Sequence, residues 1–243
     1  PGFAVQAREL TQLQSILQNQ IERHGNNIFK DGTVIIPGQL SFSNSYQSIK
    51  LTSTFGSEDV VPAQYYNATT PVIVTGATSG VEAEVIGYKD GTSTTQPTLY
   101  VKYTKTGSDF ATETFSDSEN ISANVSITHT TAYASNIASA TTHTSAAQTG
   151  SAVKVESGIY YVRGQFVRVA EQTLVLSDSS TTVSKRVGFT ISETLVTPEV
   201  DTTLTDNATG SSNYAAKGAH RLKIELTLAS LDTTSTADST FLE

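Results

Sequence analysis

The stretch that decides the fold is GIYYVRGQFVRV, residues 158–169. Two runs rich in Val, Tyr and Phe flank the dipeptide Arg163-Gly164. β-Branched and aromatic residues favour strands, and a Gly at a central turn position permits the positive φ that a tight hairpin requires. The stretch therefore predicts a β-hairpin with strands over residues 158–162 and 165–169.

Further strands are predicted on both sides of this hairpin. Residues 152–156 precede it, and residues 173–176 and 187–191 follow it. Near the end of the sequence, residues 221–228 alternate between polar and apolar side chains, which indicates a half-buried strand. Its apolar face comprises Leu222, Ile224, Leu226 and Leu228. We expect residues 152–243 to form a β-sandwich-like domain that continues beyond this fragment.

A second group of strands indicates a small inserted module over residues 57–122. Residues 72–74, 81–86 and 99–103 read as strands separated by Gly-rich turns. Short strands at such spacing are typical of a small β-barrel or sandwich. Because the flanking sequence belongs to a different domain in this interpretation, the module is an insertion with its two ends close together.

The two segments beside this module have a different character. Residues 31–56 read as a β connector that leads into the module. Residues 123–151 are rich in Thr, Ser and Ala, which predicts a linker or an extended loop. The predicted fold class is therefore mainly β, with an N-terminal helix ahead of a sandwich-like domain that carries an inserted module.

Residues 1–30 contain the one segment with clear helical periodicity. Leu10, Leu13, Leu17 and Ile21 recur at three- and four-residue spacing. Two apolar positions in seven make a narrow stripe, as in a coiled-coil seam. We expect an oligomerisation or anchoring helix. The stripe alone leaves open that the helix packs on its own β domain or on another protein.

Composition excludes several classes of protein. The 243 residues carry a formal net charge of −8 and include no Cys, Met or Trp. Without Cys there is no disulfide framework and no thiolate catalysis. An acidic balance argues against nucleic-acid binding. No apolar run approaches the ~20 residues of a membrane span. The absence of an initiator Met leads us to expect a part of a longer polypeptide.

The sequence predicts no catalytic, cofactor-binding or metal-binding residues. The four His residues are widely scattered and lack metal-ligand spacing. Neighbouring carboxylates, such as Glu82 with Glu84 and Asp201 with Asp206, are explained more simply by a solvated strand face and by turn capping. The sequence therefore predicts a protein that is not an enzyme.

Two segments carry a resemblance to a known family. The first is residues 1–17, PGFAVQARELTQLQSIL, with residues 29–32; the second runs from Gly158 through residues 187–191 to residues 206–222. Both resemble tail and baseplate fibre-type structural proteins of contractile-tailed bacteriophages, notably T4-like phages of cyanobacteria. Neither the inserted module nor the Thr/Ser-rich segment has a counterpart in that family.

This resemblance implies a structural component of a phage tail, in the baseplate or a tail fibre, that anchors and projects distal modules. It implies a virion location after assembly in the host cytoplasm. The expected partners are copies of the chain itself, in a homotrimer because the family is fibre-like, and other tail or baseplate proteins. The family is not known for an enzyme activity, and it supplies no catalytic residues.

An alternative is a receptor-binding adhesin, in which the inserted module recognises a host polysaccharide or surface protein. Sugar sites place aromatic rings beside polar groups. The candidate ligand-facing aromatic residues of the module are Tyr65, Tyr66, Tyr88, Tyr100 and Tyr103. A polysaccharide depolymerase is disfavoured because no convincing pair of carboxylates is present.

One loop is also predicted. Asn and Gly recur through residues 206–222, which favours tight turns leading directly into the last long strand. We expect Tyr214, Ala215 and Ala216 to be buried against the hairpin of residues 158–169.

Overall fold

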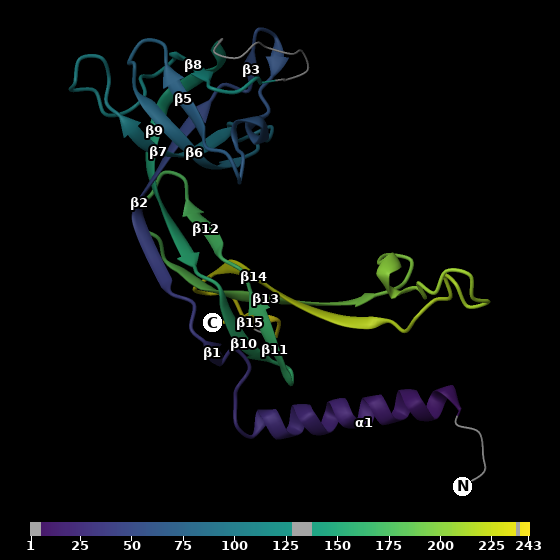
Figure 1. The fold of residues 1–243 in the computed structure, drawn as a ribbon. Helices are drawn as coiled ribbons and strands as arrows, with labels where there is room; N and C mark the ends of the chain where they lie inside the picture. Colours follow the sequence, from purple (N-terminus) through teal and green to yellow (C-terminus); the bar gives the residue numbers. More distant parts are fainter. Residues whose placement is uncertain (1–5, 128–137, 237–238) are drawn as a thin grey trace. The chain divides into compact units, whose positions relative to one another are not determined.

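The computed structural model describes residues 6–127, 138–236 and 239–243. It confirms a mainly β fold, with 47% of the chain in strands and 12% helical. One N-terminal helix precedes several antiparallel sheets, as Figure 1 shows. The chain divides into two compact units. Unit 1 comprises Pro1–Ser41, Val153–Leu174 and Ser184–Glu243, and unit 2 comprises Phe42–Ala152 and Val175–Val183.

The helix of unit 1, α1, spans Ala7–Asn26. At its start the Gln6 amide donates a hydrogen bond to Glu9 Oε2 at 2.8 Å, which satisfies one of the free amides of the first turn. At its end the Tyr161 hydroxyl donates to Asn26 Oδ1 at 2.8 Å. Gly164 also approaches this end so closely that a Cβ there would lie 2.8 Å from the Glu22 Cα. Only the C-terminal part of α1 is therefore held by the sheets of its own unit.

The predicted hairpin is confirmed and lies in the first sheet of unit 1. β10 (Gly158–Val162) pairs antiparallel with β11 (Gln165–Val169) and, on its other edge, with β1 (Val34–Ile36). The two turn residues both have positive φ, 47° at Arg163 and 80° at Gly164. This is the conformation that two-residue hairpin turns require, and Gly adopts it without steric cost.

The second sheet of unit 1 has the strand order β14-β13-β15. Its strands are β13 (Lys185–Val196), β14 (Arg221–Asp232) and β15 (Phe241–Leu242). Apolar side chains from both sheets and from the end of β9 form the core of unit 1: Val155, Tyr160, Val162, Val167, Val169, Phe189, Ile191, Leu226 and Leu228. The predicted alternation in β14 holds over the half that contacts this core. Leu222 lies beyond it, opposite Leu195, and both side chains are exposed.

The segment between β13 and β14 corrects one prediction. Tyr214 is 57% exposed, and Ala215 and Ala216 are exposed as well, so their expected burial against the hairpin is wrong. The segment, which includes the short helix η2 (Thr202–Leu204), lies at the far end of the β13–β14 ribbon (Figure 1). Turn chemistry was predicted correctly, because the segment folds on itself through backbone hydrogen bonds such as Gly218 N to Leu204 O at 2.8 Å.

Unit 2 is built on a closed antiparallel barrel. The sheet runs β12-β9-β2-β7-β6-β5-β8, and a further pairing of β8 with β9 closes the ring. The strands are β2 (Leu40–Leu51), β5 (Val72–Gly76), β6 (Glu82–Lys89), β7 (Thr98–Lys105), β8 (Asn120–Ala123), β9 (Ala138–Val155) and β12 (Gln172–Ser177). Unit 2 is larger than the module expected over residues 57–122, since it takes in most of β2 and β9 as well.

Alternation along the barrel strands defines the core of unit 2. Successive side chains of a strand point to opposite faces, so every second residue faces the interior. Fully buried examples include Ile49, Leu51, Val74, Leu99 and Ile121. A two-stranded ribbon, β3 (Thr54–Phe55) with β4 (Glu58–Asp59), and the helix η1 (Pro62–Tyr65) complete the unit. The buried Tyr65 of η1 belongs to the same core.

The Thr/Ser-rich segment 123–151 is corrected in part. Residues 128–137 lie outside the described residues, but residues 138–151 belong to β9 and not to a linker. Small side chains explain this result. Ala140 and Thr142 are fully buried two positions apart, so this low-complexity sequence alternates as a strand that faces a crowded interior.

Candidate functional site

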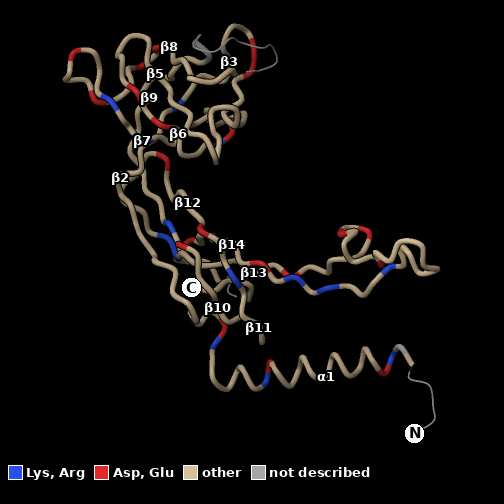
Figure 2. The backbone as a smooth tube through the Cα atoms, viewed as in Figure 1, with Lys and Arg blue, Asp and Glu red and all other residues tan. Residues whose placement is uncertain are grey.

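The predicted stripe on α1 is exposed along its whole length. Leu10, Leu13, Leu17 and Ile21 are 55%, 62%, 54% and 52% exposed. Residues 10–21 also contain no charged side chain, and Figure 2 shows α1 coloured only near its two ends. An uncharged helix face with four exposed aliphatic side chains is not what a solvated surface requires. This face is the first candidate site.

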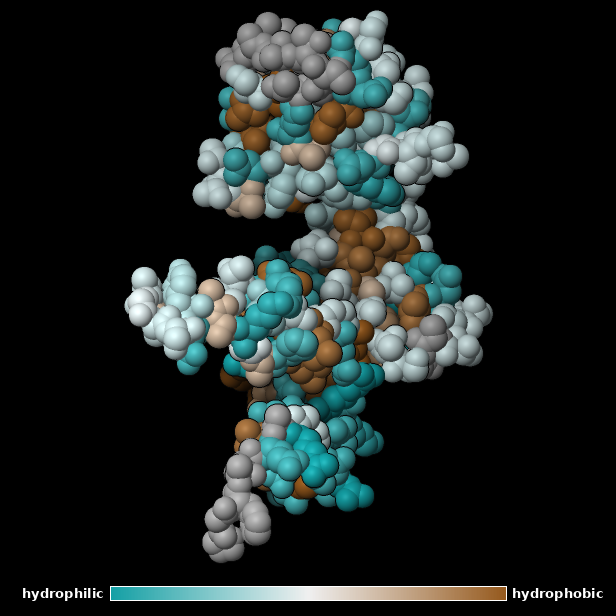
Figure 3. Space-filling view, turned by 90° about the vertical axis from the view of Figure 1, so that its right-hand side faces the viewer, coloured by the Kyte–Doolittle hydropathy of each residue, from teal (hydrophilic) through white to brown (hydrophobic). Residues whose placement is uncertain are grey.

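More apolar side chains of unit 1 are exposed outside α1. They include Val34, Ile36 and Leu40 near β1, Phe166 on β11, Leu195 on β13 and Val200 beyond it. Figure 3 shows hydrophobic side chains, in brown, that reach the surface among hydrophilic ones. Clusters of exposed apolar side chains mark interaction surfaces. Unit 1 therefore offers apolar contact area beyond its helix.

The candidate tyrosines are distributed between core and surface. Tyr65 is fully buried and is not available to a ligand, and Tyr103 is half-buried with its ring against Phe115. Tyr66 and Tyr88 are exposed, and their ring centroids lie 6.0 Å apart. Tyr100 is 7% exposed and belongs to a different feature, a pocket on the outer face of the barrel.

The pocket follows from strand register. On β2, Ile49 and Leu51 face the barrel core, so Ser48 and Lys50 point to the outer face. Ser48 lies opposite Tyr100 and Lys50 opposite Thr98 on β7, and Thr98 also lies opposite Lys89 on β6. Lys50 and Lys89 are thus carried by strands on either side of Thr98, with backbones about 10 Å apart.

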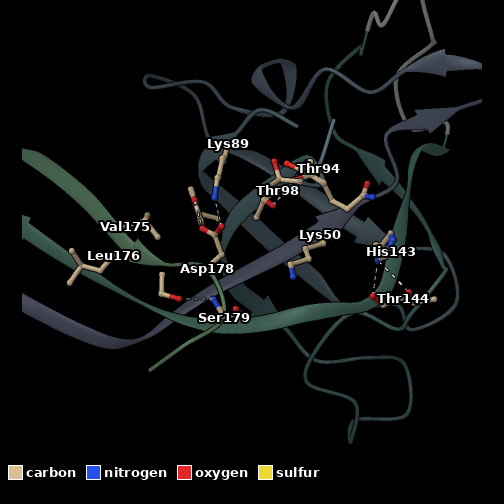
Figure 4. Close-up of a pocket in the computed structure, with 14 residues that line it drawn as sticks. Lys50, Lys89, Thr94, Thr98, His143, Thr144, Val175, Leu176, Asp178 and Ser179 are labelled. Atoms are coloured by element: carbon tan, nitrogen blue, oxygen red, sulfur yellow. Dashed lines mark hydrogen bonds and ion pairs between the residues drawn. The ribbon is translucent and has the colours of Figure 1, made fainter. Parts of the chain in front are cut away.

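The residues around this row enclose a pocket of about 600 Å³ within unit 2. Figure 4 shows side chains from β2, β6, β9 and the segment after β12 arranged around it. Its lining is rich in hydroxyl and amide groups, and the full set is Lys50, Lys89, Thr94, Thr95, Gln96, Thr98, Tyr100, His143, Thr144, Val175, Leu176, Ser177, Asp178 and Ser179. Small-molecule sites typically have volumes of roughly 300–1,000 Å³.

Asp178 fixes one wall of the pocket. Its Oδ2 accepts a hydrogen bond from Lys89 Nζ at 2.5 Å, and its Oδ1 accepts one from the Tyr100 hydroxyl at 2.7 Å. The Ser48 hydroxyl donates to the Asp178 carbonyl at 3.0 Å. Burial acts to raise the pKa of Asp178, but the hydrogen bonds from Lys89 and Tyr100 and the charges of Lys89 and Lys50 lower it overall.

Tyr100 keeps its proton in this arrangement. Burial, followed by the hydrogen bond to Asp178 and the negative charge of that carboxylate, raises the pKa of the Tyr100 hydroxyl. Lys89, Tyr100 and Asp178 therefore form a hydrogen-bonded group, called the locked group below, in which the lysine and the tyrosine both donate to the carboxylate.

Three other residues of the pocket each have a polar atom that forms no hydrogen bond or ion pair with the described residues. Lys50 is half-buried and forms no ion pair in the described part of the chain. Gln96 Oε1 is buried without a hydrogen-bond partner among the described residues. His143 Nδ1 lies 2.8 Å from the Thr144 carbonyl, and because a carbonyl only accepts, we assign the ring proton to Nδ1, which makes Nε2 an acceptor.

Other titratable groups have structural explanations. Glu82 pairs with Lys105 at 2.7 Å, and Asp201 accepts from the Thr203 amide at 3.0 Å at the start of η2. Within residues 6–127, 138–236 and 239–243, no group of three or more His, Cys, Asp or Glu side chains is placed to hold a metal ion. None of the described helices combines the length and apolar character needed to cross a membrane.

Sequence reasoning missed the pocket. Lys50, Lys89 and Asp178 were not singled out, and His143 was set aside as part of a low-complexity segment. Alternation along β2 carries a usable signal, since it places Ser48 and Lys50 on one outward face. The approach of Asp178 from a segment more than 70 residues away from Tyr100 has no local sequence signature.

Comparison with known proteins gives a family without an assigned role. Residues 119–242 match the family described as a domain of unknown function, DUF4815. No curated protein and no solved structure matches the chain. The matched segment runs from the start of β8 to β15, and it includes His143 and Asp178 of the pocket but not α1. Because the match spans just over half of the 243 residues, the chain belongs to the DUF4815 family.

Proposed function

We propose that this chain is a structural subunit of a bacteriophage tail, in the baseplate or a tail fibre, and that it works as a homo-oligomer. The observation that carries the proposal is the exposed, uncharged apolar face of α1. The resemblance of residues 1–17 and 158–222 to tail and baseplate fibre-type proteins supports the assignment of this chain to a phage tail.

Helix energetics require a partner for α1. Most helical stability in proteins comes from packing an apolar face and not from intrinsic helix propensity. Only Glu22 and Gly25 of α1 are even partly buried among its described side chains, so the unit itself supplies little packing. The remaining stabilisation must come from another molecule.

The narrow width of the stripe favours copies of the same helix as that partner. Two apolar positions in seven suit a seam between helices that pack around a common axis. Exposed apolar side chains such as Val34, Ile36 and Phe166 supply further area for contacts between β domains. A trimer is the form we propose, because the family that the sequence resembles is fibre-like.

The mass of the purified full chain in solution tests the assembly. We expect a trimer for the unmodified chain and a monomer for the double variant Leu13→Asp, Leu17→Asp, because each charge would be buried in the seam. Ser15→Asp with Asn19→Asp is the matched control, since it adds the same two charges at the same spacing on the opposite helix face. The control should remain a trimer.

Two results would contradict the proposal. A monomeric unmodified chain would exclude self-assembly, and an oligomer that survives both charges in the seam would exclude α1 as the assembling element. The tail assignment is tested separately, by locating the chain in images of intact phage particles. A chain absent from purified particles would contradict that assignment.

A further inference from the structure

The pocket of unit 2 contains two kinds of polar group that are available to a ligand, one cationic hydrogen-bond donor and two hydrogen-bond acceptors. Lys50 is half-buried and forms no ion pair among the described residues, so its ammonium is free to bind an anionic acceptor. Gln96 Oε1 and His143 Nε2 are acceptors, so they require a hydrogen-bond donor. A carboxylate alone can bind the ammonium but cannot donate to the two acceptors, and a neutral alcohol can donate to the acceptors but carries no charge for the ammonium.

The neighbouring locked group restricts where an anion can sit. Lys89 already forms an ion pair with Asp178, so Lys50 is the lysine of the pocket that remains unpaired among the described residues. Lys50 and His143 come from β2 and β9, and Figure 4 draws Lys50 between Asp178 on one side and His143 on the other. Asp178 lies close enough to Lys50 for the charge of Lys50 to lower its pKa, so a ligand carboxylate must bind Lys50 on the side away from Asp178, which would repel it at shorter range.

The rest of the lining favours hydroxyl groups on the ligand. Thr94, Thr95 and Gln96 form one side, in the loop between β6 and β7, and Val175 and Leu176 add a small apolar surface. Val175 and Leu176 can pack on the apolar face of a sugar ring, in place of the aromatic ring that other sugar sites use, while the hydroxyl groups and the Gln96 amide can pair with the ring hydroxyls. The chain as a whole carries a net charge of −8, which repels anions at long range. The attraction for an anion at this pocket would therefore come from the local charge of Lys50.

We propose that this pocket binds an acidic sugar residue, with its carboxylate on Lys50 and its hydroxyl groups donating to Gln96 Oε1 and His143 Nε2. The binding is independent of the assembly role of α1, because every lining residue belongs to unit 2. Tyr100, expected from the sequence to face a ligand, acts instead as a positioning residue that holds Asp178.

Saturation-transfer NMR on the full chain tests the ligand class, because it detects weak binding to proteins and oligomers of any size. Methyl β-D-glucuronide is the probe, and methyl β-D-glucoside is its neutral match. We expect millimolar binding of the glucuronide and at least tenfold weaker binding of the glucoside. Equal binding of the two, or no binding of the glucuronide, would overturn the proposal.

Inorganic phosphate distinguishes a sugar site from a simple anion site. Phosphate should displace the glucuronide only at concentrations at least tenfold above the dissociation constant of the glucuronide, with total ionic strength held constant. Displacement at or below that constant would overturn the proposal, since it would show that the anionic group alone accounts for binding.

Variants locate the binding to the pocket. Lys50→Ala should weaken glucuronide binding at least fivefold, and Gln96→Met, which keeps the shape but removes the acceptor, should do the same. Lys102→Ala is the matched control, because Lys102 is an exposed lysine of β7 that does not line the pocket. Circular dichroism checks that each variant is folded. Unchanged affinity in Lys50→Ala, or equal losses in Lys50→Ala and Lys102→Ala, would overturn the assignment.

Discussion

At the scale of single residues, the chain contains a buried carboxylate that acts as a structural cap. Glu119 is 4% exposed. Its Oε2 accepts from the amides of Thr78 at 3.0 Å and Ser79 at 2.9 Å, and its Oε1 accepts from the Ser116 amide at 2.6 Å. The carboxylate thus satisfies backbone donors of two separate turns, without a cation beside it. Removing the carboxylate would leave the buried amide of Ser79 and the part-buried amides of Thr78 and Ser116 without this acceptor.

We expect Glu119→Ala to lower the free energy of unfolding by about 3 kcal/mol, because one buried and two part-buried amides lose their acceptor at once. Urea denaturation measures the loss. Glu113→Ala is the control, since Glu113 is an exposed glutamate in the same segment and its removal should change stability by less than about 0.5 kcal/mol. Similar values for the two variants would contradict a structural role for Glu119.

Asp178 gives a prediction with a defined pH dependence. Its folded-state pKa is lowered, so its contribution to stability is fully present above the unfolded-state pKa and is lost as pH falls through the folded-state pKa. At pH 7 we expect Asp178→Asn to cost about 2 kcal/mol, since hydrogen bonds to a charged group are replaced by neutral ones.

The difference between the unmodified chain and Asp178→Asn should shrink below about pH 4, where the carboxyl of the unfolded chain becomes protonated while the folded chain, with its lowered pKa, keeps it ionised. Urea denaturation at a series of pH values measures it. Asp90→Asn, at an exposed position beside the same pocket wall, is the control and should show no such trend. A difference that stays constant down to pH 2.5 would show that the charge of Asp178 is not what stabilises the fold.

At the scale of elements, local chemistry was the part of the fold that could be predicted. The hairpin of β10 and β11 was found because strand propensity and the turn Arg163-Gly164 agree within twelve residues. The start of β14 at Arg221 was found for a similar reason, since its alternation is visible in the sequence. These signals depend on no distant partner.

Elements that depend on distant partners were missed. Residues 138–151 of β9 were interpreted as part of a linker or an extended loop because Thr, Ser and Ala carry little strand signal on their own, and the pairing of β9 with β8 and β2 is non-local. Tyr214 was expected in a core because it is large and apolar, but the core of unit 1 ends before β14 reaches that segment. Composition does not reveal where a core stops.

The candidate sites show the same division. The stripe of α1 was found from helical period alone, because its four members share one face of one element. The pocket joins side chains of five strands and of two connecting segments, and its lysines meet only through the register of β2, β7 and β6. That register was not available from the sequence.

At the scale of the whole molecule, the chain carries two separate hydrophobic cores. The cluster of unit 2 includes Leu99 and the cluster of unit 1 includes Leu226, and the two clusters have no residue in common. Both leucines are buried. Regions with their own cores tend to open as separate cooperative units. β2, β9 and β12 each cross the boundary between the two units. Because these strands link the units, independent opening of the two cores has to be tested.

We therefore expect two matched core variants to act on different regions. Leu99→Ala and Leu226→Ala remove the same atoms, and each should destabilise its own core by about 2–5 kcal/mol. Hydrogen exchange measured by mass spectrometry on the full chain should show faster exchange in β5, β6 and β7 for Leu99→Ala, with β13 and β14 unchanged. Leu226→Ala should show the converse. Faster exchange throughout both units in either variant would mean that the strands crossing the boundary transmit the loss, and that the chain unfolds as one cooperative body.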